Sequence, residues 1–230
     1  MLGTIVNFIA IGVGGLAGLF FGKAFPEKLK TTVIQGIGLT VIIIGLQMAI
    51  KTTNVLIIIA SLVLGGLIGE SIDIEARLND FGKYLEKKLS SNGEGQFTKG
   101  FVTTSLIYCV GAMAIVGSLE DGLNGNHSIL YAKSALDGIT AIVFSSSMGV
   151  GVIFSAIPVF LYQGSISLFA GMLQGILSEP VVLEMSAVGG LLIFGIGINM
   201  LGIKEIKVGN LLPGIFIAVP LTILFKHFGL

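Results

Sequence analysis

The stretch Leu2–Gly22, LGTIVNFIAIGVGGLAGLFFG, holds no charged side chain from end to end. A helix needs about 20 mostly apolar residues to cross the hydrocarbon core of a bilayer, because only intrahelical hydrogen bonds can satisfy its backbone there. The stretch therefore predicts a transmembrane helix. It lacks a basic start and a small-residue cleavage site, so we interpret it as a retained helix and not as a signal peptide.

Similar apolar runs recur along the whole chain. They predict an all-α, polytopic transmembrane helix bundle of about eight spans, in a single transmembrane domain over residues 1–230. The expected spans are 2–22, 32–50, 55–71, 100–118, 132–160, 166–178, 184–203 and 211–226. The fifth run is too long for one straight helix and the sixth is short, so we expect a break in one of them. A hairpin within the fifth run would move the C-terminus to the opposite side of the membrane.

The composition agrees with a membrane protein. Hydrophobic residues make up 53 % of the chain and charged residues 11 %, which excludes an exterior that faces water throughout. The net charge of +0, from 13 basic and 13 acidic residues, leaves no excess for binding nucleic acid. The 34 glycines suit membrane helices, whose backbones approach closely because lipid gives them no hydrophobic drive to associate.

Basic residues predict the orientation, because they favour cytoplasmic loops. Lys23, Lys28 and Lys30 lie in the first loop, and five basic residues lie between positions 77 and 99 in the third. We therefore expect both loops in the cytoplasm and both termini outside. Within the third loop, residues 72–89 carry apolar side chains at spacings of three and four, which predicts a cytoplasmic amphipathic helix in the membrane interface.

Two pairs of segments suggest an internal repeat. AGLFFGKAFPE at 17–27 resembles AGMLQGILSEP at 170–180, and IGLQM at 44–48 resembles IGINM at 196–200. Spans one to three would then repeat spans six to eight. Because span one starts outside and span six inside, these triplets would be inverted repeats, an arrangement of secondary transporters that places the substrate near the midplane at the repeat interface.

The repeat places Gln47 and Asn199 at equivalent positions. A primary amide in hydrocarbon needs a partner or a water-filled cavity, so the two residues either line a solute path or form an interhelical hydrogen bond. Lys133 and Asp137 are four residues apart, on one helix face, and can neutralise each other. Asp137 is the carboxylate that we most expect to meet an ion or a proton, and a purely structural ion pair is the alternative.

Three consecutive serines, Ser145, Ser146 and Ser147, precede two glycines inside the fifth run. They predict an unwound turn whose carbonyl groups could coordinate a cation, or whose N–H groups could face an anion. Close helix packing is the alternative interpretation. Gln163 lies further along the same polar region.

Asp121 lies in an outer loop with the pattern D-x-x-N-x-N, which lacks the full calcium-loop motif and suits a solvated turn. His127, His227 and Cys109 form no cluster in the sequence, so we expect no zinc or haem site and no cofactor. The chain carries no recognisable nucleophile and base, no protease motif and no phosphate-binding loop, so we do not expect an enzyme.

Four segments carry a resemblance to a known family: GSLEDGLNG (117–125), KSALDG (133–138), GVGVIFSAIPV (149–159) and YQG (162–164). The chain resembles the YqgA/YdfK type of bacterial inner-membrane proteins, which are of unknown function and regarded as transporters. The similarity covers essentially the whole chain. It implies a multi-pass protein of the bacterial inner (cytoplasmic) membrane and carries over no functional residue.

From these features we expect a transporter of a small polar or ionic solute, either ion-gradient-driven or facilitative. Its path would include Gln47, Asp137, Ser145, Ser146, Ser147 and Asn199, with Asp121, Lys133 and Gln163 in secondary positions. The alternatives are an ion channel and a non-transporting membrane scaffold that docks a cytoplasmic partner through residues 72–89. The expected partners are the lipid bilayer and the solute or ion, and the sequence leaves a homo-oligomer open.

Overall fold

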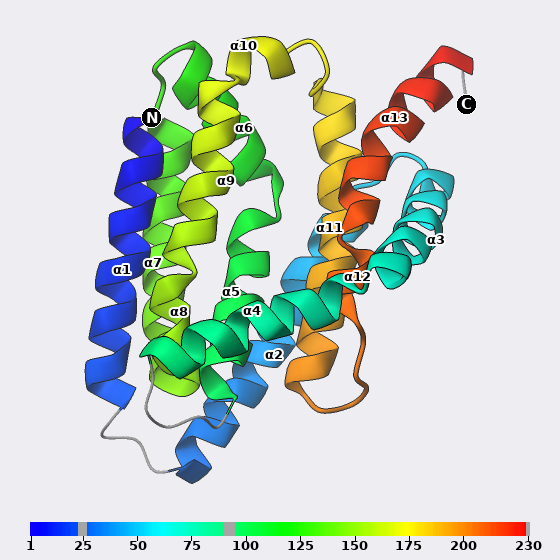
Figure 1. Ribbon diagram of the computed structural model, residues 1–230. Coiled ribbons are helices and arrows are strands. Elements are labelled where there is room, and N and C mark those ends of the chain that lie inside the picture. The colour runs from blue at the N-terminus through cyan, green and yellow to red at the C-terminus, as the bar shows by residue number, and fades with distance from the viewer. Residues whose placement is uncertain (23–26, 90–94, 229–230) are drawn as a thin grey trace. The chain divides into compact units, whose positions relative to one another are not determined.

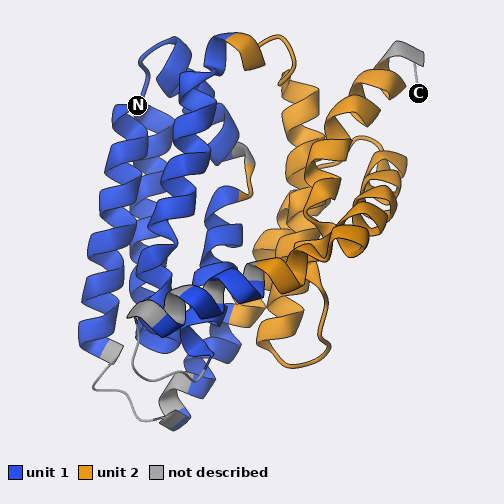
Figure 2. Cartoon of the chain, viewed as in Figure 1, with its two compact units in different colours: residues 1–37, 78–109, 113–171 blue, residues 38–77, 110–112, 172–230 orange. Residues whose placement is uncertain are grey.

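The computed structural model describes residues 1–22, 27–89 and 95–228, and these residues form helices and no strand (Figure 1). The basic loop around Lys23 and part of the link after residue 89 lie outside the described residues. The chain divides into two compact units (Figure 2). Unit 1 comprises residues 1–37, 78–109 and 113–171, and unit 2 comprises residues 38–77, 110–112 and 172–230.

Close contact between two parallel helices organises unit 1. α1 (Leu2–Gly22) packs along α7 (Ser128–Met148), with Gly3 beside Leu130 and Gly18 beside Ile142. A Cβ atom at Gly14 would collide with the carbonyl oxygen of Gly138. Gly14 and Gly18 form a G-x-x-x-G motif, which lets membrane helices approach until their backbones touch.

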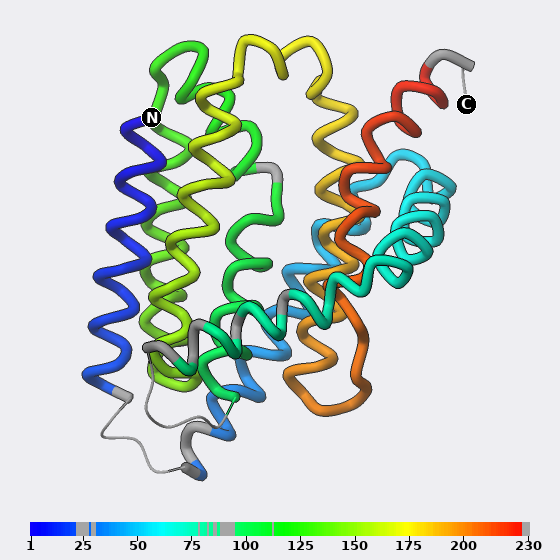
Figure 3. The backbone as a smooth tube through the Cα atoms, in the orientation of Figure 1, coloured from blue at the N-terminus to red at the C-terminus, as the bar shows by residue number. Residues whose placement is uncertain are grey.

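The chain reverses direction after α7. Gly149 ends the helix with a φ of 81°, α8 (Gly151–Phe154) makes the turn, and α9 (Ala156–Leu168) returns (Figure 3). α9 runs antiparallel to α1, because the rings of Phe8 and Phe160 lie 5.5 Å apart while Gly15 lies beside Ile153. The prediction of a single span over 132–160 is therefore wrong, and the alternative that the sequence left open, a hairpin, is the structure that forms.

Two other predicted spans also differ from the structure. The run 100–118 is divided into α5 (Gln96–Cys109) and α6 (Ala112–Leu123), which meet at an angle of 61°. Gly111 lies at this bend with a φ of 139°, which a side chain would oppose. The run 166–178 does not form a span, because α9 ends at Leu168 and only the short α10 (Ala170–Leu173) follows before residue 179.

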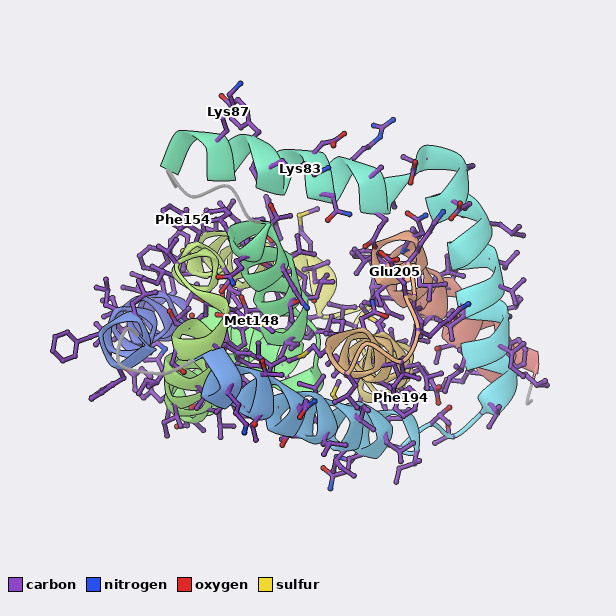
Figure 4. All side chains as sticks on the ribbon, turned by 90° about the horizontal axis from the view of Figure 1, so that it is seen from below. Lys83, Lys87, Met148, Phe154, Phe194 and Glu205 are labelled. Atoms are coloured by element: carbon purple, nitrogen blue, oxygen red, sulfur yellow. The ribbon has the colours of Figure 1, made fainter. Side chains whose placement is uncertain are left out.

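The predicted amphipathic helix over 72–89 forms as α4 (Ile74–Leu89), two residues shorter at its start. It begins where α3 ends, since Asp73 adopts a left-handed conformation with a φ of 55° and its N–H bonds to the end of α3. Phe81 contacts Phe101 of α5, with 6.1 Å between ring centroids. Lys87 is exposed and points away from these helices (Figure 4).

Glycine contacts also build unit 2. It contains α2 (Glu27–Ala49) from residue 38, α3 (Val55–Ile72), α11 (Glu179–Met200), α12 (Val208–Leu211) and α13 (Pro213–Phe228). α11 packs antiparallel to α2, where Gly45 meets the backbone of Gly190 and Gly197 meets that of Gly38. α3 packs antiparallel to α13, where Gly65 meets Gly214. The helices of this unit therefore also touch at backbone distance.

Several of the described helices are long and apolar enough to cross a membrane. Within residues 1–22, 27–89 and 95–228 there are six of them, or seven if the bent pair α5 and α6 counts as one span. They lie in Leu2–Phe21, Thr31–Ala49, Val55–Ile72, Gly151–Leu168, Glu179–Met200 and Val208–Lys226. The chain is thus a multi-pass membrane protein, and α7 is the long helix that falls below this criterion.

The glycine contact between α1 and α7 makes a testable prediction. Gly14→Ala places a methyl group against the backbone of Gly138, and overpacking of this kind costs about 1–3 kcal/mol. Gly12→Ala, on the same helix, is the matched control, because its Cβ meets no atom within 4 Å. Thermal unfolding of the detergent-solubilised protein should show a lower midpoint for Gly14→Ala alone. Equal midpoints for the two variants would contradict the direct contact between Gly14 and the backbone of Gly138.

Candidate functional site

A buried ion pair lies at the centre of the polar residues in unit 1. Lys133 and Asp137 are one turn apart on α7, and Lys133 Nζ donates to Asp137 Oδ2 over 2.6 Å. Each residue is only 6 % exposed. Asp137 comes nine residues after Ser128, so at about 1.5 Å per residue it lies ~14 Å into the helix, near its middle.

Two amides from neighbouring helices complete this group. Asn7 Nδ2 of α1 donates to Asp137 Oδ2 over 3.0 Å and to Gln163 Oε1 of α9 over 3.3 Å. Both amide residues are 0 % exposed. Among the described residues, Asn7 Oδ1 and Gln163 Nε2 have no hydrogen-bond partner. We call Asn7, Lys133, Asp137 and Gln163 the polar cluster.

Unpartnered buried atoms are unusual, because a polar group in an apolar medium costs several kcal/mol without a hydrogen bond. Thr4, one turn before Asn7 on α1, also has a buried Oγ1 atom without a partner among the described residues. The polar cluster and Thr4 therefore offer buried donors and acceptors that the described residues do not use.

An aromatic side chain covers the ion pair from α5. Lys133 Nζ lies 5.9 Å from the ring centroid of Tyr108, within the range of a cation–π interaction. Thr140 Oγ1 donates to the Tyr108 hydroxyl oxygen over 3.3 Å. Tyr108 is 1 % exposed, so it closes this side of the polar cluster with an apolar surface.

The predicted site residues fall into separate places. Lys133, Asp137 and Gln163 come together in the polar cluster. Asp121 does not join them: it receives the N–H of Gly3 over 3.3 Å, contacts His127 Nδ1 and pairs with the amino group of Met1 over 2.8 Å. Asp121 lies in the last turn of α6 and is 3 % exposed, so the predicted solvated turn in an outer loop is wrong at this residue, which instead ties the end of α6 to the start of α1.

The three serines lie at the end of α7, at the turn into α8. Ser145 Oγ donates to the carbonyl of Gly149 over 3.2 Å, and Ser146 Oγ donates to that of Val143 over 2.8 Å. Ser147 Oγ is buried and has no partner among the described residues. Seen from below in Figure 4, Met148 and Phe154 mark the two ends of this turn. The serines therefore border the predicted break in the helix.

Gln47 and Asn199, both in unit 2, are placed differently from each other. Gln47 is exposed on α2. Asn199 Nδ2 donates to the carbonyl of Ile206, and Asn199 Oδ1 accepts from the N–H of Ile206, both over 2.8 Å. Asn199 thus holds the loop after α11 in place. Gln47 and Asn199 are equivalent in the predicted repeat, but their amide groups share no partner among the described residues.

Sequence reasoning missed several residues with buried polar groups, among them Thr4, Asn7 and Glu184. Asn7 stands alone in the apolar run of α1, and Glu184 lies near the start of α11. Glu184 is 0 % exposed and accepts from Thr52 Oγ1 over 2.6 Å, Thr53 N over 2.7 Å and Thr53 Oγ1 over 2.9 Å. The available signal was the polar residue in an apolar run, since such residues in membrane helices have a structural or functional partner.

A second polar group lies where α3 and α12 meet in unit 2. Glu70 accepts from Lys207 Nζ and from Asn210 Nδ2, each over 2.6 Å, while Glu75 accepts from the N–H of Gly209 over 2.6 Å. The hydrogen bond to Glu70 raises the pKa of Lys207. Glu70 and Lys207 are both 58 % exposed, so this ion pair lies at the surface and adds little stability.

Comparisons with known proteins support the family resemblance. A family model described as "Protein of unknown function (DUF554)" matches residues 2–223. The "Uncharacterized membrane protein YdfK" of Bacillus subtilis (strain 168) is 33 % identical over 234 residues, which cover 100 % of this chain and 99 % of the relative. The "Uncharacterized protein YqgA" of Escherichia coli (strain K12) is 29 % identical over 229 residues, 96 % of each chain. No solved structure matches significantly. The predicted resemblance to the YqgA/YdfK type is confirmed.

The buried ion pair predicts non-additive effects of mutation. Lys133→Met leaves Asp137 buried without its cation, which should lower stability by roughly 3–5 kcal/mol. Lys133→Met/Asp137→Leu removes both charges and should recover most of that loss. Thermal unfolding of the single and double variants in detergent measures the coupling, with Lys87→Met on the exposed face of α4 as a control. Additive losses would show that the two residues do not depend on each other.

The hydrogen bonds of Glu184 predict that removal of its carboxylate lowers the stability of unit 2. Glu184→Ala leaves the Thr52 and Thr53 donors unpaired, and hydrogen bonds to a carboxylate contribute about 1.5–3 kcal/mol each. Glu179→Ala removes an exposed carboxylate from the same helix and should change stability little. Unfolding midpoints compare the two variants directly, and an equal effect would rule out the structural role assigned to Glu184.

Proposed function

This chain belongs to the DUF554 family, and we propose that it is a transporter of a small polar or ionic solute. The proposed binding site is the polar cluster of Asn7, Lys133, Asp137 and Gln163. The solute would move down its own gradient or be driven by an ion gradient. Both named relatives are bacterial, which supports a location in the bacterial inner (cytoplasmic) membrane.

One observation carries the proposal: the ion pair is buried beside two amides with unused polar atoms. Charged side chains within membrane segments are costly, and those that occur mark substrate or ion paths and proton relays. A purely structural pair would be most stable if every neighbouring polar group were satisfied. Here Asn7 Oδ1 and Gln163 Nε2 stay available among the described residues, as a site that must bind and release a solute requires.

We propose eight spans: α1, α2, α3, the bent pair α5 and α6, α7, α9 with its preceding turn, α11, and α13 with α12. The hairpin of α7 and α9 adds a span to the predicted count, and the missing span at 166–178 removes one. Eight spans keep the basic loops around Lys28, Arg77 and Lys207 on one side, in agreement with the positive-inside rule. Both termini are then outside.

We also propose inverted repeats, with α9, α11 and α13 as the counterparts of α1, α2 and α3. Antiparallel packing of each helix on its counterpart supports this assignment. α2 and α11 make two glycine contacts, Gly45 with Gly190 and Gly38 with Gly197. Each contact becomes the other when every glycine is replaced by its counterpart in the repeat. Under the match of 44–48 with 196–200, Gly38 corresponds to Gly190 and Gly45 to Gly197, as a pseudo-two-fold axis requires.

The proposal predicts solute movement that depends on Asp137. The purified full chain in liposomes should take up at least one solute from a panel of alkali cations, amino acids and organic acids, above protein-free liposomes. Asp137→Asn should lower the uptake rate at least about tenfold, equivalent to ~1.4 kcal/mol on the barrier. Asp80→Asn, a carboxylate exposed on α4, is the matched control and should transport normally.

Other results would favour a different function. If the Asp137→Asn variant takes up solute at the wild-type rate, the polar cluster is not part of the transport mechanism. Flux far above transporter turnover in single-channel recordings would identify a channel. Inert liposomes, together with a cellular phenotype lost on deletion of residues 73–96, would instead support a scaffold that acts through α4.

A further inference from the structure

The oxygen atoms around Asp137 suit a small cation. The carboxylate of Asp137, the carbonyl oxygen Oε1 of Gln163 and the carbonyl oxygen Oδ1 of Asn7 belong to the polar cluster, and the hydroxyl of Thr4 lies one helical turn before Asn7 on α1. Carboxylate, amide and hydroxyl oxygens are the ligands that hard cations prefer. Two of these oxygens, Asn7 Oδ1 and Thr4 Oγ1, are buried and unpartnered among the described residues.

The net charge of the polar cluster favours a monovalent cation over a divalent one. Asp137 is the one carboxylate in the polar cluster, and among the described residues no three His, Cys, Asp or Glu side chains form a group that could hold a metal ion. Divalent cations are bound by several carboxylates or by carboxylate and substrate phosphates. One carboxylate among neutral oxygens balances a monovalent ion.

Lys133 already fills the role of that ion. Its ammonium group lies 2.6 Å from Asp137 Oδ2 and neutralises the carboxylate from within the protein. In this state Asn7 turns its amide nitrogen toward Asp137, at 3.0 Å. A half-turn of the amide about χ2 exchanges the nitrogen and the oxygen, which would bring Oδ1 to a cation held by Asp137. The Asn7 amide can therefore donate to Asp137 when Lys133 is paired with it, and can accept the cation when the cation is bound.

We propose that the polar cluster is a monovalent cation site at which Lys133 competes as an internal cation, so that the transporter exchanges a cation for a proton. This inference rests on the proposed transport function and names its substrate class. The cation displaces the Lys133 ammonium from Asp137. Two positive charges beside one carboxylate cannot stay buried, because an uncompensated charge in an apolar medium is very costly.

The displaced ammonium relieves this charge by losing a proton. One N–H bond of Lys133 Nζ breaks, its electron pair stays on the nitrogen, and the proton leaves to water. The site then holds the cation, the Asp137 carboxylate and a neutral amine, so its net charge is unchanged. The titratable groups that face the pair from neighbouring helices are Tyr108 and Cys109 of α5, whereas Asn7 and Gln163 contribute neutral groups.

A thermal-shift titration of the detergent-solubilised full chain tests the exchange. LiCl, NaCl and KCl are compared with choline chloride at equal ionic strength, between pH 6 and pH 9. At least one alkali cation should raise the unfolding temperature above the effect of choline. Its half-saturating concentration should fall by about tenfold per pH unit, the linkage expected when one proton leaves for each cation that binds.

Variants separate displacement of Lys133 from simple binding. Lys133→Met should still bind the cation, with a half-saturating concentration that no longer changes with pH. Asp137→Asn should abolish the cation-specific shift, while Asp80→Asn should behave as the wild type. A second measurement needs no variant: addition of the cation to the wild-type protein in weak buffer should release about one proton per chain, followed with a pH indicator dye.

Three results would overturn the inference: no shift beyond that of choline, binding that is independent of pH in the wild type, or an unchanged pH dependence in Lys133→Met. These failures are distinguishable from failure of the proposed function. If an organic solute moves in an Asp137-dependent way without any cation effect, the transport function stands and the cation exchange is wrong. If no solute of the panel moves, the transport function itself is wrong.

Discussion

The polar cluster depends on the direct contact of the α1 and α7 backbones. Gly14 and Gly18 allow α1 to lie against the carbonyl groups of α7, and Asn7 lies two turns before Gly14 on the same helix. Only at this separation does the short side chain of Asn7 reach Asp137. Lipid gives helices no hydrophobic drive to associate, so glycine contacts and interhelical hydrogen bonds must hold them together. In unit 1 the two kinds of contact support each other along one pair of helices.

The parts of this arrangement that follow from local spacing could be predicted from the sequence. Lys133 and Asp137 share a helix face because they are four residues apart, whatever surrounds them. Asn7 could not be assigned in this way, since its two partners are 130 and 156 residues away in the sequence. The position of the break near Gly149 was also predictable. The reversal of the chain there was not, because an apolar run has the same hydropathy whether it continues or turns back.

Two buried polar groups, one in each unit, differ in how far their hydrogen-bonding atoms are satisfied. Glu184 in unit 2 accepts hydrogen bonds from Thr52 and Thr53, so the turn between α2 and α3 is held by a carboxylate whose partners are all local to that turn. In the polar cluster of unit 1, by contrast, two amides keep unused atoms. A fully satisfied buried network rigidifies a structure, whereas unused buried donors and acceptors leave positions for a water molecule or an ion. The difference explains why burial alone did not single out the candidate site.

The polarity of α7 also bears on how the chain is made. α7 carries an ion pair and three consecutive serines, and it is the long helix that is not apolar enough to qualify as a span by itself. A lysine or aspartate near the middle of a helix opposes insertion from the translocon by about 2.5–3.5 kcal/mol. Under the proposed topology, α7 therefore enters the bilayer with help from helices that can shield it. α1 is synthesised before α7 and carries both the glycine face and Asn7, so it is available to shield a segment that is synthesised more than a hundred residues later.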